Sequence, residues 1–379
     1  MTILNSPVGL DTERLMPGHP STLAVFGETD ASTLICRQVQ EITDDVKTFL
    51  FEPAEPVLFQ HEPGQFVTLS LEIDGRPVSR CYTIATPPTR PRLLGITVKR
   101  HPGGPVSNWL HDTMAPGRRI SAEGPFGVFT ITRHRSAKYL FLSGGSGITP
   151  VMSMTRTLYD LGSDVDVVFV HSARTPADII FRRELDTIAE TVPTMRVAHV
   201  CERDAPREPW GGLRGFLSMD MLRMLAPDLS ERVVFCCGPA PYMAAVRRML
   251  DDTGFDMRNY HEESFSFEDL STAGAATPAT TDGNSAADNG QGTTYSVEFT
   301  RSGRTFTCAE DGFVLDAAYA AGLNPASSCG QGMCGTCKTT LLAGSVDMQH
   351  NGGIRPREIA SKKVLICCSK PLSDLTIDA

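Results

Sequence analysis

The stretch CGQGMCGTC, from Cys329 to Cys337, places three cysteines within nine residues of the chain. The second of them is Cys334, and a further cysteine, Cys367, follows after 29 intervening residues. Four thiolates, two for each iron, are what a 2Fe–2S cluster requires, and this spacing is that of the plant-type sites. The sequence therefore predicts that these four cysteines hold a 2Fe–2S cluster.

Two alternatives stand beside this prediction. A structural zinc site also uses four cysteines, but it typically pairs short C-x2–4-C knuckles, whereas here only the fourth ligand is remote. Cys368 directly follows the fourth ligand and is a second candidate for its place. The C-x3-P pattern from Cys367 to Pro371 favours Cys367, which leaves Cys368 as a small packing residue. Three glycines interleave the first three ligands and let the loop wrap closely around a cluster: Gly330, Gly332 and Gly335.

The overall composition narrows the class of protein. The chain has 379 residues, enough for two or three domains. Its 11 cysteines, in a sequence that starts without a secretory signal, argue against a disulfide framework and for metal or redox chemistry. Because no apolar run reaches the length of a membrane span, we expect a cytoplasmic protein without a membrane partner. The net charge of −9 argues against nucleic acid as a partner.

Changes in residue pattern divide the chain into five segments. Residues 1–32 are polar and aperiodic and form an N-terminal arm. Short β-like runs between Pro and Gly turns predict an antiparallel β-barrel over residues 33–134. Strands that alternate with helices predict a parallel α/β sheet over residues 135–267. Residues 268–293, rich in Ala, Gly, Ser, Thr and Asp, predict a flexible linker with a reach of roughly 25–30 Å, and residues 294–379 form a compact module.

Individual stretches predict the elements within these segments. KYLFLSG and VDVVFVHSA are apolar enough to be buried parallel strands. The helical stretch TPVMSMTRTLYDLG ends at Gly162, and VLDAAYAAG is a short helix closed by Gly322. YSVEFT and RTFTC predict a hairpin that turns at Ser302 and Gly303.

A flavin site is indicated by Arg80, Tyr82 and Thr83 on one strand of the predicted barrel. A flavin requires a cation for its pyrophosphate, an aromatic plane against its ring and a hydroxyl near N5. Arg80 and Tyr82, two residues apart, supply the first two from one face of a strand, and Thr83 supplies the third. Alone this pattern is weak, because an Arg and a Tyr on a strand are usually surface residues.

Two glycine-containing stretches are further candidates for the flavin. HPGGPVSNWL offers Gly103, Gly104 and Ser107 in front of a helix, where N–H groups and a hydroxyl suit a pyrophosphate. EGPFG is either an ordinary barrel turn or a second cofactor contact; its residues are Gly124, Pro125 and Gly127.

A nucleotide site is indicated by GGSGITP, from Gly144 to Pro150, which follows a buried strand and opens a helix. That context is required of a loop that cradles phosphates. It is not the G-x-G-x-x-G fingerprint, because Pro150 stands in place of the third glycine, and a structural turn is the alternative. Cys237, Gly238 and Pro239 end a later strand, at the carboxyl edge where ligands bind in such sheets. Buried packing is the alternative role for that cysteine.

Taken together, R-x-Y-T, G-G-x-V-S, G-G-x-G-x-T-P and C-G-P, in this order, resemble the ferredoxin–NADP reductase superfamily, followed by a plant-type ferredoxin. The resemblance covers residues 33–379 apart from the linker. It implies an antiparallel FAD-binding β-barrel, a parallel α/β NAD-binding domain and a β-grasp 2Fe–2S domain. The implied contacts are Arg80, Tyr82 and Thr83 for the flavin; Gly104, Val106 and Ser107 for its pyrophosphate; and Gly144, Gly145, Gly147, Thr149, Pro150, Cys237, Gly238 and Pro239 for the nucleotide.

The resemblance also implies which residues serve the reaction centre. HEESF matches the family's E-x-aromatic ending, so that Glu263 and Phe265 lie by the flavin, and Phe265 covers it until the nicotinamide arrives. Thr83 and Cys237 complete the implied catalytic set. His261 and Glu263 either tune the flavin or have a plain structural role.

The C-terminal segment from GSVDMQ to the end resembles reductase components of Rieske oxygenases that demethylate betaine-type quaternary amines. The implied function is electron transfer from NADH through FAD and the 2Fe–2S cluster to such an oxygenase. The segment is also similar to the reductase of hybrid-cluster proteins, which is the alternative. A self-contained oxygenase would need a Rieske C-x-H…C-x2-H pair or a haem domain, and the sequence shows neither. A pure electron carrier would lack the nucleotide motifs, which this sequence has.

Charged residues bear on the choice of nucleotide and on a possible protein partner. Mixed charge after the predicted strands, with Arg174, Glu202, Arg203 and Asp204, favours NADH over NADPH, since a 2′-phosphate requires a basic pocket. A basic stretch near the C-terminus is either a solvated face or a docking patch for an acidic partner; it contains Arg355, Arg357, Lys362, Lys363 and Lys370.

Overall fold

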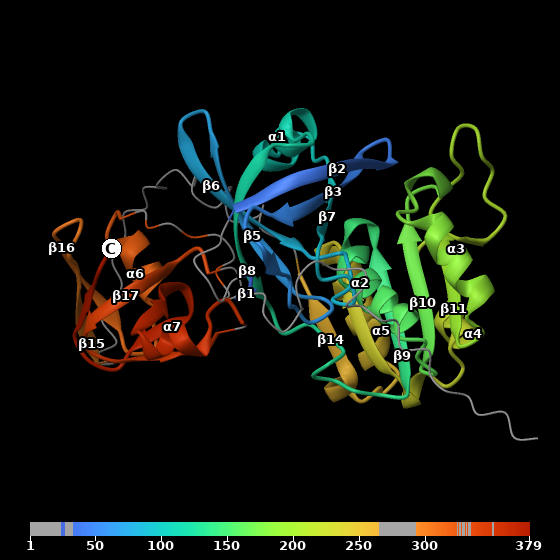
Figure 1. Ribbon diagram of the computed structural model, residues 1–379. Helices are drawn as coiled ribbons and strands as arrows, with labels where there is room; N and C mark the ends of the chain where they lie inside the picture. Colours follow the sequence, from blue (N-terminus) through green and yellow to red (C-terminus); the bar gives the residue numbers. More distant parts are fainter. Residues whose placement is uncertain are drawn as a thin grey trace, which may run out of the picture.

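A computed structural model describes residues 24–26, 33–264, 293–323, 325, 327, 330, 332, 335–350 and 352–379 of the chain. Figure 1 shows three bodies side by side: a barrel domain in the middle, a parallel-sheet domain on one side and a C-terminal domain on the other. The predicted arm over residues 1–32, apart from its last described residues 24–26, and the predicted linker lie outside the described residues.

The barrel domain is an antiparallel sheet in the strand order β6-β5-β8-β2-β3-β7. A bridge between Ile84 and Ile96 brings the two ends of this order together and closes the sheet. Its interior holds apolar side chains such as Phe49, Val67 and Leu69. This confirms the predicted antiparallel flavin-type barrel. The elements are β1 (Ala24–Val25), β2 (Thr33–Thr43), β3 (Val46–Pro53), β4 (Val57–Leu58), β5 (Phe66–Ile73), β6 (Arg76–Thr83), β7 (Leu94–Lys99), α1 (Pro105–Thr113) and β8 (Arg119–Phe126).

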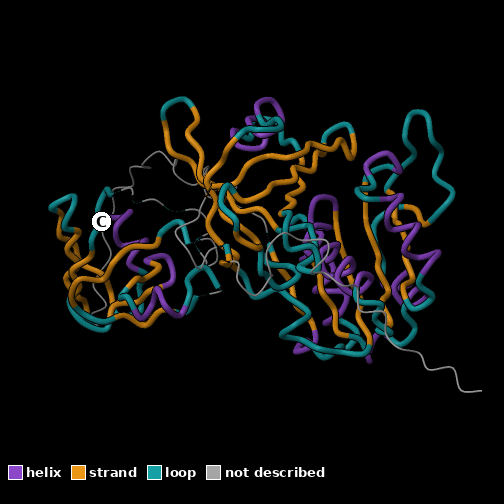
Figure 2. Tube along the Cα trace, viewed as in Figure 1, coloured by secondary structure: helices purple, strands orange, loops and turns teal. Residues whose placement is uncertain are grey.

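The parallel-sheet domain has the strand order β12-β11-β10-β9-β13-β14, and every pairing is parallel. Helices α2 and α3 cover one face, over Phe141 and Phe169, and α4 and α5 cover the other, over Leu142 and Val170. Figure 2 shows these helices on both faces of the strands. The elements are β9 (Lys138–Gly144), α2 (Ile148–Asp160), β10 (Asp166–Ala173), α3 (Arg182–Thr191), β11 (Met195–Cys201), β12 (Leu213–Arg214), α4 (Met219–Leu225), β13 (Val233–Cys237), α5 (Ala240–Asp251) and β14 (Tyr260–Glu263).

The C-terminal domain has a mixed sheet in the order β16-β15-β21-β17-β19, beside a small pair of β18 and β20. The predicted hairpin is present, with β15 and β16 antiparallel and Gly303 in the left-handed region at a φ of 62°. Helix α6 packs on the sheet and ends before Gly322, as its sequence predicts. The elements are β15 (Thr294–Phe299), β16 (Arg304–Ala309), α6 (Val314–Ala320), β17 (Lys338–Ala343), β18 (Val346–Met348), α7 (Pro356–Ala360), β19 (Lys363–Leu365), β20 (Ser369–Pro371) and β21 (Leu375–Ile377).

Candidate functional site

Strand β6 carries the three residues predicted to hold the flavin. Arg80 and Tyr82 project from one face and Thr83 from the other, because side chains alternate along a strand. Tyr82 packs against the barrel core, and the Arg80 guanidinium donates to the carbonyl oxygen of Ser79 at 2.8 Å. Thr83 is only 4% exposed, and its hydroxyl has no hydrogen-bond partner among the described residues. A buried hydroxyl in this state fits a site that a polar ligand atom completes.

The loop in front of α1 is shaped by hydrogen bonds of its own. The Ser107 hydroxyl donates to the carbonyl oxygen of Gly104 and accepts from the N–H of His101, each at 3.2 Å. A Cβ on Gly104 would lie 2.8 Å from that hydroxyl oxygen, so glycine keeps the turn tight. Val106 is buried beneath it. The Ser107 hydroxyl thus serves the loop, and an anion would be met by the N–H groups of the helix N-terminus.

The nucleotide-type loop and the Cys-Gly-Pro turn lie against each other at the carboxyl edge of the parallel sheet. A Cβ on Gly147 would lie 2.3 Å from the carbonyl oxygen of Cys237, and one on Gly238 would lie 3.1 Å from the N of Gly144. Gly145 adopts a φ of 53°, and its Cα faces open space. The glycines therefore let two backbones meet while leaving room above the loop. Thr149 and Pro150 lie in the first turn of α2 and are buried.

Cys237 and Glu263 lie beside each other, because β13 and β14 pair in parallel with these two residues in register. The Cys237 thiol is fully buried, and burial, with the nearby Glu263 carboxylate, raises its pKa well above the usual value. The Glu263 side chain is also buried, at 5% exposure, and its Oε2 has no hydrogen-bond partner among the described residues. Burial raises the pKa of Glu263 to about 8. The carboxyl group is thus neutral near pH 7 and can donate a hydrogen bond.

His261 stacks on His134, which lies on the connection between the barrel and the sheet domain. The two ring centroids are 3.6 Å apart, with an angle of 24° between the planes. Burial, with a smaller effect of His134, lowers the pKa of His261 to about 4. The ring also contacts Phe235 of β13. This packing supports a structural role for His261.

A buried arginine joins the two halves of the site, and the sequence analysis did not identify it. Arg156 of α2 donates from Nη1 to the carbonyl oxygen of Ala85 at 2.7 Å, two residues after Thr83. Its Nε and Nη2 bond both carboxylate oxygens of Glu184 at 2.7 and 2.6 Å, and its guanidinium lies 4.5 Å from the Phe181 ring centroid. The helix that begins at the nucleotide loop is thereby fixed to the end of the flavin strand.

The same helix has two further links to the barrel domain. The Ser153 hydroxyl donates to the carbonyl oxygen of Thr86 at 3.0 Å. Asp160, at the end of α2, accepts two hydrogen bonds from the Arg90 guanidinium on the surface.

The sequence signal for Arg156 is an arginine in the middle of a helical stretch of apolar and small residues, TPVMSMTRTLYD.

Two of the four predicted cluster ligands are described by the structure, and both are buried. Cys337 and Cys367 are 5% and 4% exposed. The N–H of Gly332 donates to the Cys367 sulfur at 3.2 Å, as a backbone amide does toward a cluster thiolate. Cys368 differs, because its thiol donates to the carbonyl oxygen of Leu365 at 3.5 Å within the core. These contacts favour Cys367 as the ligand; Cys329 and Cys334, like Phe265, lie outside the described residues.

The turn that includes Gly124 and Gly127 meets the C-terminal domain. Arg355 donates from Nη2 to the carbonyl oxygen of Gly124, and its guanidinium lies 5.2 Å from the ring centroid of Phe126. Lys338 of β17 lies at the same distance from that ring. The basic stretch predicted near the C-terminus thus contributes Arg355 to a contact within the chain.

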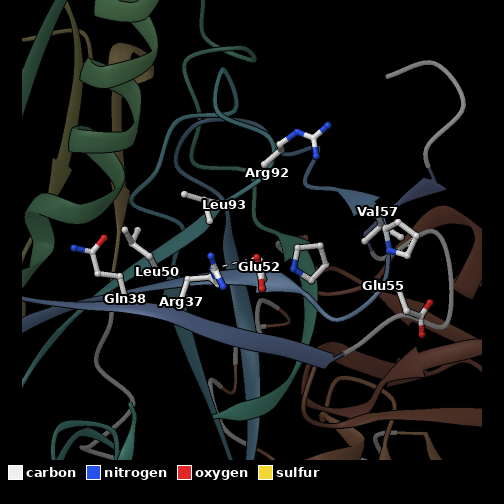
Figure 3. Close-up of a pocket in the computed structure, with 10 residues that line it drawn as sticks. Arg37, Gln38, Leu50, Glu52, Glu55, Val57, Arg92 and Leu93 are labelled. Atoms are coloured by element: carbon white, nitrogen blue, oxygen red, sulfur yellow. Dashed lines mark ion pairs between the residues drawn. The ribbon is translucent and has the colours of Figure 1, made fainter. Parts of the chain in front are cut away.

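A surface pocket of about 520 Å³ lies on the barrel domain, at residues other than those predicted to bind a cofactor (Figure 3). Two of its charged side chains form an ion pair, with Arg37 Nε 3.3 Å from the Glu52 carboxylate. Such exposed ion pairs are ordinary surface features. The lining residues are Arg37, Gln38, Leu50, Glu52, Pro53, Glu55, Pro56, Val57, Arg92 and Leu93.

Comparison with known domains agrees with this geometry. Residues 34–131 match the oxidoreductase FAD-binding domain, residues 141–248 the oxidoreductase NAD-binding domain, and residues 297–372 the 2Fe-2S iron-sulfur cluster binding domain. The chain therefore has domains for FAD, a nicotinamide nucleotide and a 2Fe–2S cluster. In the described part of the chain, no helix has the length and hydropathy that a membrane crossing requires.

Two curated relatives match along most of both chains. The glycine betaine monooxygenase reductase subunit of Pseudomonas aeruginosa is 46% identical, over 90% of this chain and 94% of its own. The stachydrine N-demethylase reductase subunit of Rhizobium meliloti is 42% identical, over 93% and 97%. Among solved structures, phthalate dioxygenase reductase shares the fold, with a TM-score of 0.55 and 23% identity over 92% and 97% of the two chains. The chain belongs to the family of oxygenase reductase components that join an FAD-binding, an NAD-binding and a 2Fe–2S domain in one polypeptide.

Proposed function

We propose that this chain is the NADH-dependent reductase of a Rieske-type oxygenase that removes a methyl group from a betaine-type quaternary amine. The similarity to the two reductase subunits, along nearly the whole chain, carries this proposal, because glycine betaine and stachydrine are both methylated quaternary amines. The same relatives favour an oxygenase as acceptor over a hybrid-cluster protein. We place the reaction in the cytoplasm, where NADH is available.

In this proposal the barrel domain holds FAD through the residues that the sequence singled out. Arg80 would bind the pyrophosphate, Tyr82 would pack against the ring, and the N-terminus of α1, with Gly104, Val106 and Ser107, would supply N–H donors. When bound, FAD accepts hydride from NADH and releases electrons one at a time, and the 2Fe–2S cluster carries single electrons onward.

Three side chains form the proposed reaction centre. The Thr83 hydroxyl, which has no hydrogen-bond partner among the described residues, would donate a hydrogen bond to the flavin ring. Glu263 keeps a proton on its carboxyl group near neutral pH and offers a second donor, because burial raises its pKa to about 8. Cys237 remains a thiol, because burial raises its pKa, and is small enough to leave room for the nicotinamide. The hydride step needs no general acid or base, and we assign none.

The nucleotide lies, in this proposal, over the glycines of the loop that opens α2. Gly145 leaves the space, Gly144 and Gly147 let the loop pack against the Cys-Gly-Pro turn, and Thr149, Pro150, Gly238 and Pro239 border the site. Two contacts support NADH over NADPH: Arg174 faces the carboxylates of Asp178 at 3.4 Å and Asp45 at 3.7 Å. A cation already matched by two carboxylates is poorly placed to bind a 2′-phosphate.

The cluster is held, in the same proposal, by Cys329, Cys334, Cys337 and Cys367. Both described ligands are buried, and the Gly332 N–H, which donates to the Cys367 sulfur, would stabilise the negative charge that a cluster takes up on reduction. Phe265 is proposed to cover the flavin until the nicotinamide displaces it.

Reconstitution tests the proposal. Purified holoprotein is mixed with the oxygenase component of the Pseudomonas aeruginosa glycine betaine monooxygenase, glycine betaine, oxygen and either NADH or NADPH. We expect formaldehyde release in proportion to NADH oxidation, and at least about tenfold less with NADPH. The C337S variant is the control: it should lose formaldehyde release but keep ferricyanide reduction, which needs only the flavin. Formaldehyde release that does not depend on the reductase, or cytochrome c reduction without any coupled demethylation, would contradict the proposal.

A further inference from the structure

The C-terminal domain meets the barrel domain through a small face beside the cluster loop, which we call the docking face. It consists of Lys338, Gly352 and Arg355. The opposite side is the segment Glu123–Gly127 at the end of β8. Figure 1 shows the two domains next to each other at β8.

The contact is close at the backbone. A Cβ on Gly352 would lie 3.1 Å from the backbone N, Cα and C atoms of Gly127, so the backbones of the two domains touch at this point. From there a short path leads to the cluster loop, because the N–H of Gly353 donates to the carbonyl oxygen of Gly332 at 3.0 Å. The N–H of Gly332 in turn bonds the Cys367 sulfur. The docking face is therefore the outer side of the cluster site.

The other side of the contact leads toward the flavin strand. Phe126 is buried between the Lys338 and Arg355 cations, each 5.2 Å from its ring centroid. Its ring lies 6.1 Å from that of Phe66, which pairs in register with Thr83 across β5 and β6. The docked position thus brings the cluster loop toward the proposed flavin site.

Lys338 has one carboxylate partner in each of the two domains. Lys338 lies 3.6 Å from Glu123 of the barrel domain, but only 2.9 Å from Glu358 of its own domain. Burial alone would raise the pKa of Glu358. The hydrogen bonds that its carboxylate accepts from the Lys338 ammonium and the Arg355 N–H outweigh burial, so the pKa of Glu358 is lowered. Glu123 is 61% exposed, and an exposed ion pair contributes little stability. When Glu123 leaves, Lys338 keeps a carboxylate partner in Glu358, and the docking face presents the Lys338 and Arg355 cations.

We propose that the docking face is shared: the Glu123–Gly127 segment occupies it while the cluster is reduced, and an acidic patch on the oxygenase occupies it afterwards. The partner is the oxygenase named in the proposed function, and this inference rests on that function for the partner's identity. Electrons pass in two separate steps, because one binding event excludes the other. Charge complementarity of this kind governs association rates and partner choice.

The E123K variant separates the two contacts, because it changes the barrel side and leaves the docking face intact. In full-length holoprotein we expect cluster reduction by NADH, followed at 25 °C by anaerobic stopped-flow absorbance, to slow about threefold or more. The KM for the oxygenase component should fall by a similar factor, because the Glu123–Gly127 segment would compete less well for the docking face. R355Q should slow cluster reduction and raise that KM, whereas K363Q, an exposed lysine of β19 in the same domain, should change neither. An unchanged KM in E123K, or KM changes of the same sign in E123K and R355Q, would overturn the proposal.

A second measurement does not depend on the identity of the oxygenase. A carbodiimide should join Lys338 to Glu123 in the wild-type holoprotein, and peptide mass spectrometry should detect the product. Poly-L-glutamate, as an acidic polypeptide, should suppress this crosslink at low ionic strength, and 0.5 M NaCl should reverse the suppression, since salt screens such contacts. A crosslink that poly-L-glutamate leaves unchanged would refute the shared face, while failure of the oxygenase assay alone would count only against the proposed function.

Discussion

Cys237 and Glu263 face each other in register across the parallel strands β13 and β14, both buried, at the carboxyl edge of the sheet. Neither side chain has the surroundings that favour ionisation, because burial raises the pKa of both groups. The proposed hydride site is thus lined by a neutral thiol and a neutral carboxyl group near pH 7.

The first prediction concerns the pH dependence of stability. The pKa of Glu263 rises from 4.5 to about 8 on folding, so between these values the folded chain holds a proton that the unfolded chain has lost. The stabilising effect is complete below pH 4.5 and disappears as the pH rises through about 8, at up to about 1.4 kcal/mol per pH unit. Unfolding of E263Q by urea between pH 5 and 9 should lack this slope.

The matched control for this prediction is E262Q, on the same strand. Glu262 accepts a hydrogen bond from Tyr260 at 2.7 Å and pairs with Arg247 at the surface. E262Q should keep the slope of the wild type. Parallel curves for the wild type and E263Q would show that Glu263 does not titrate in this range.

The second prediction concerns the Thr83 hydroxyl. Valine has the same shape without the hydroxyl, so T83V should keep the flavin but slow its reduction by NADH roughly 10- to 100-fold, as loss of one preorganised donor does. T83S restores the hydroxyl and should stay within about threefold of the wild type. Anaerobic stopped-flow measurement of flavin bleaching gives both rates. Equal rates in T83V and the wild type would remove Thr83 from the reaction centre.

The third prediction concerns Arg156, which we regard as a positioning residue. R156K loses the paired bonds to Glu184 and the bond to Ala85, so the nucleotide loop shifts relative to the flavin strand. Hydride transfer should slow about tenfold or more, with the Kd for NADH within about twofold, because small misplacements affect the reaction more than binding.

R90Q is the matched comparison for this third prediction. It removes an exposed link between the same helix and the same barrel loop, and should slow the reaction by less than about twofold. Equal losses in R90Q and R156K, or a loss in R156K that lies wholly in NADH binding, would argue for a merely structural contact.

The fourth prediction separates Cys367 from Cys368. C367S should lose the visible absorbance and electron paramagnetic resonance signal of the 2Fe–2S cluster and the reduction of cytochrome c, yet keep ferricyanide reduction through the flavin. C368S should retain the cluster, because its thiol bonds the Leu365 carbonyl within the core. The reverse result would exchange the roles of the two residues.

Much of the architecture is predictable because its determinants are local. The apolar runs of β9 and β10 have no polar alternation, which is what a doubly covered parallel strand requires. Turns are marked by glycines that adopt positive φ, such as Gly162 and Gly322. The close approach of the loop at Gly147 to Cys237 has no local signal, since the residues lie far apart in the sequence.

Other features were not predictable, for reasons that differ. Strand β14 is short and mostly polar, YHEE, so its pattern does not show that it pairs with β13 at the edge of the sheet. The bond between Arg355 and Gly124 spans 231 residues, and no local signal relates these positions. The role of Ser107 in its own loop depends on geometry that residue types alone do not specify.

The contact of Gly352 with Gly127 would set the spacing between the two redox centres in the proposed docked state. Both residues have positive φ, at 89° and 107°, and their backbones touch without a side chain between them. Electrons cross such gaps by tunnelling, whose probability decays steeply with each added ångström. In that docked state, one methyl group on Gly352 would act as a spacer against Gly127 and slow electron transfer between the two redox centres, even though it carries no charge.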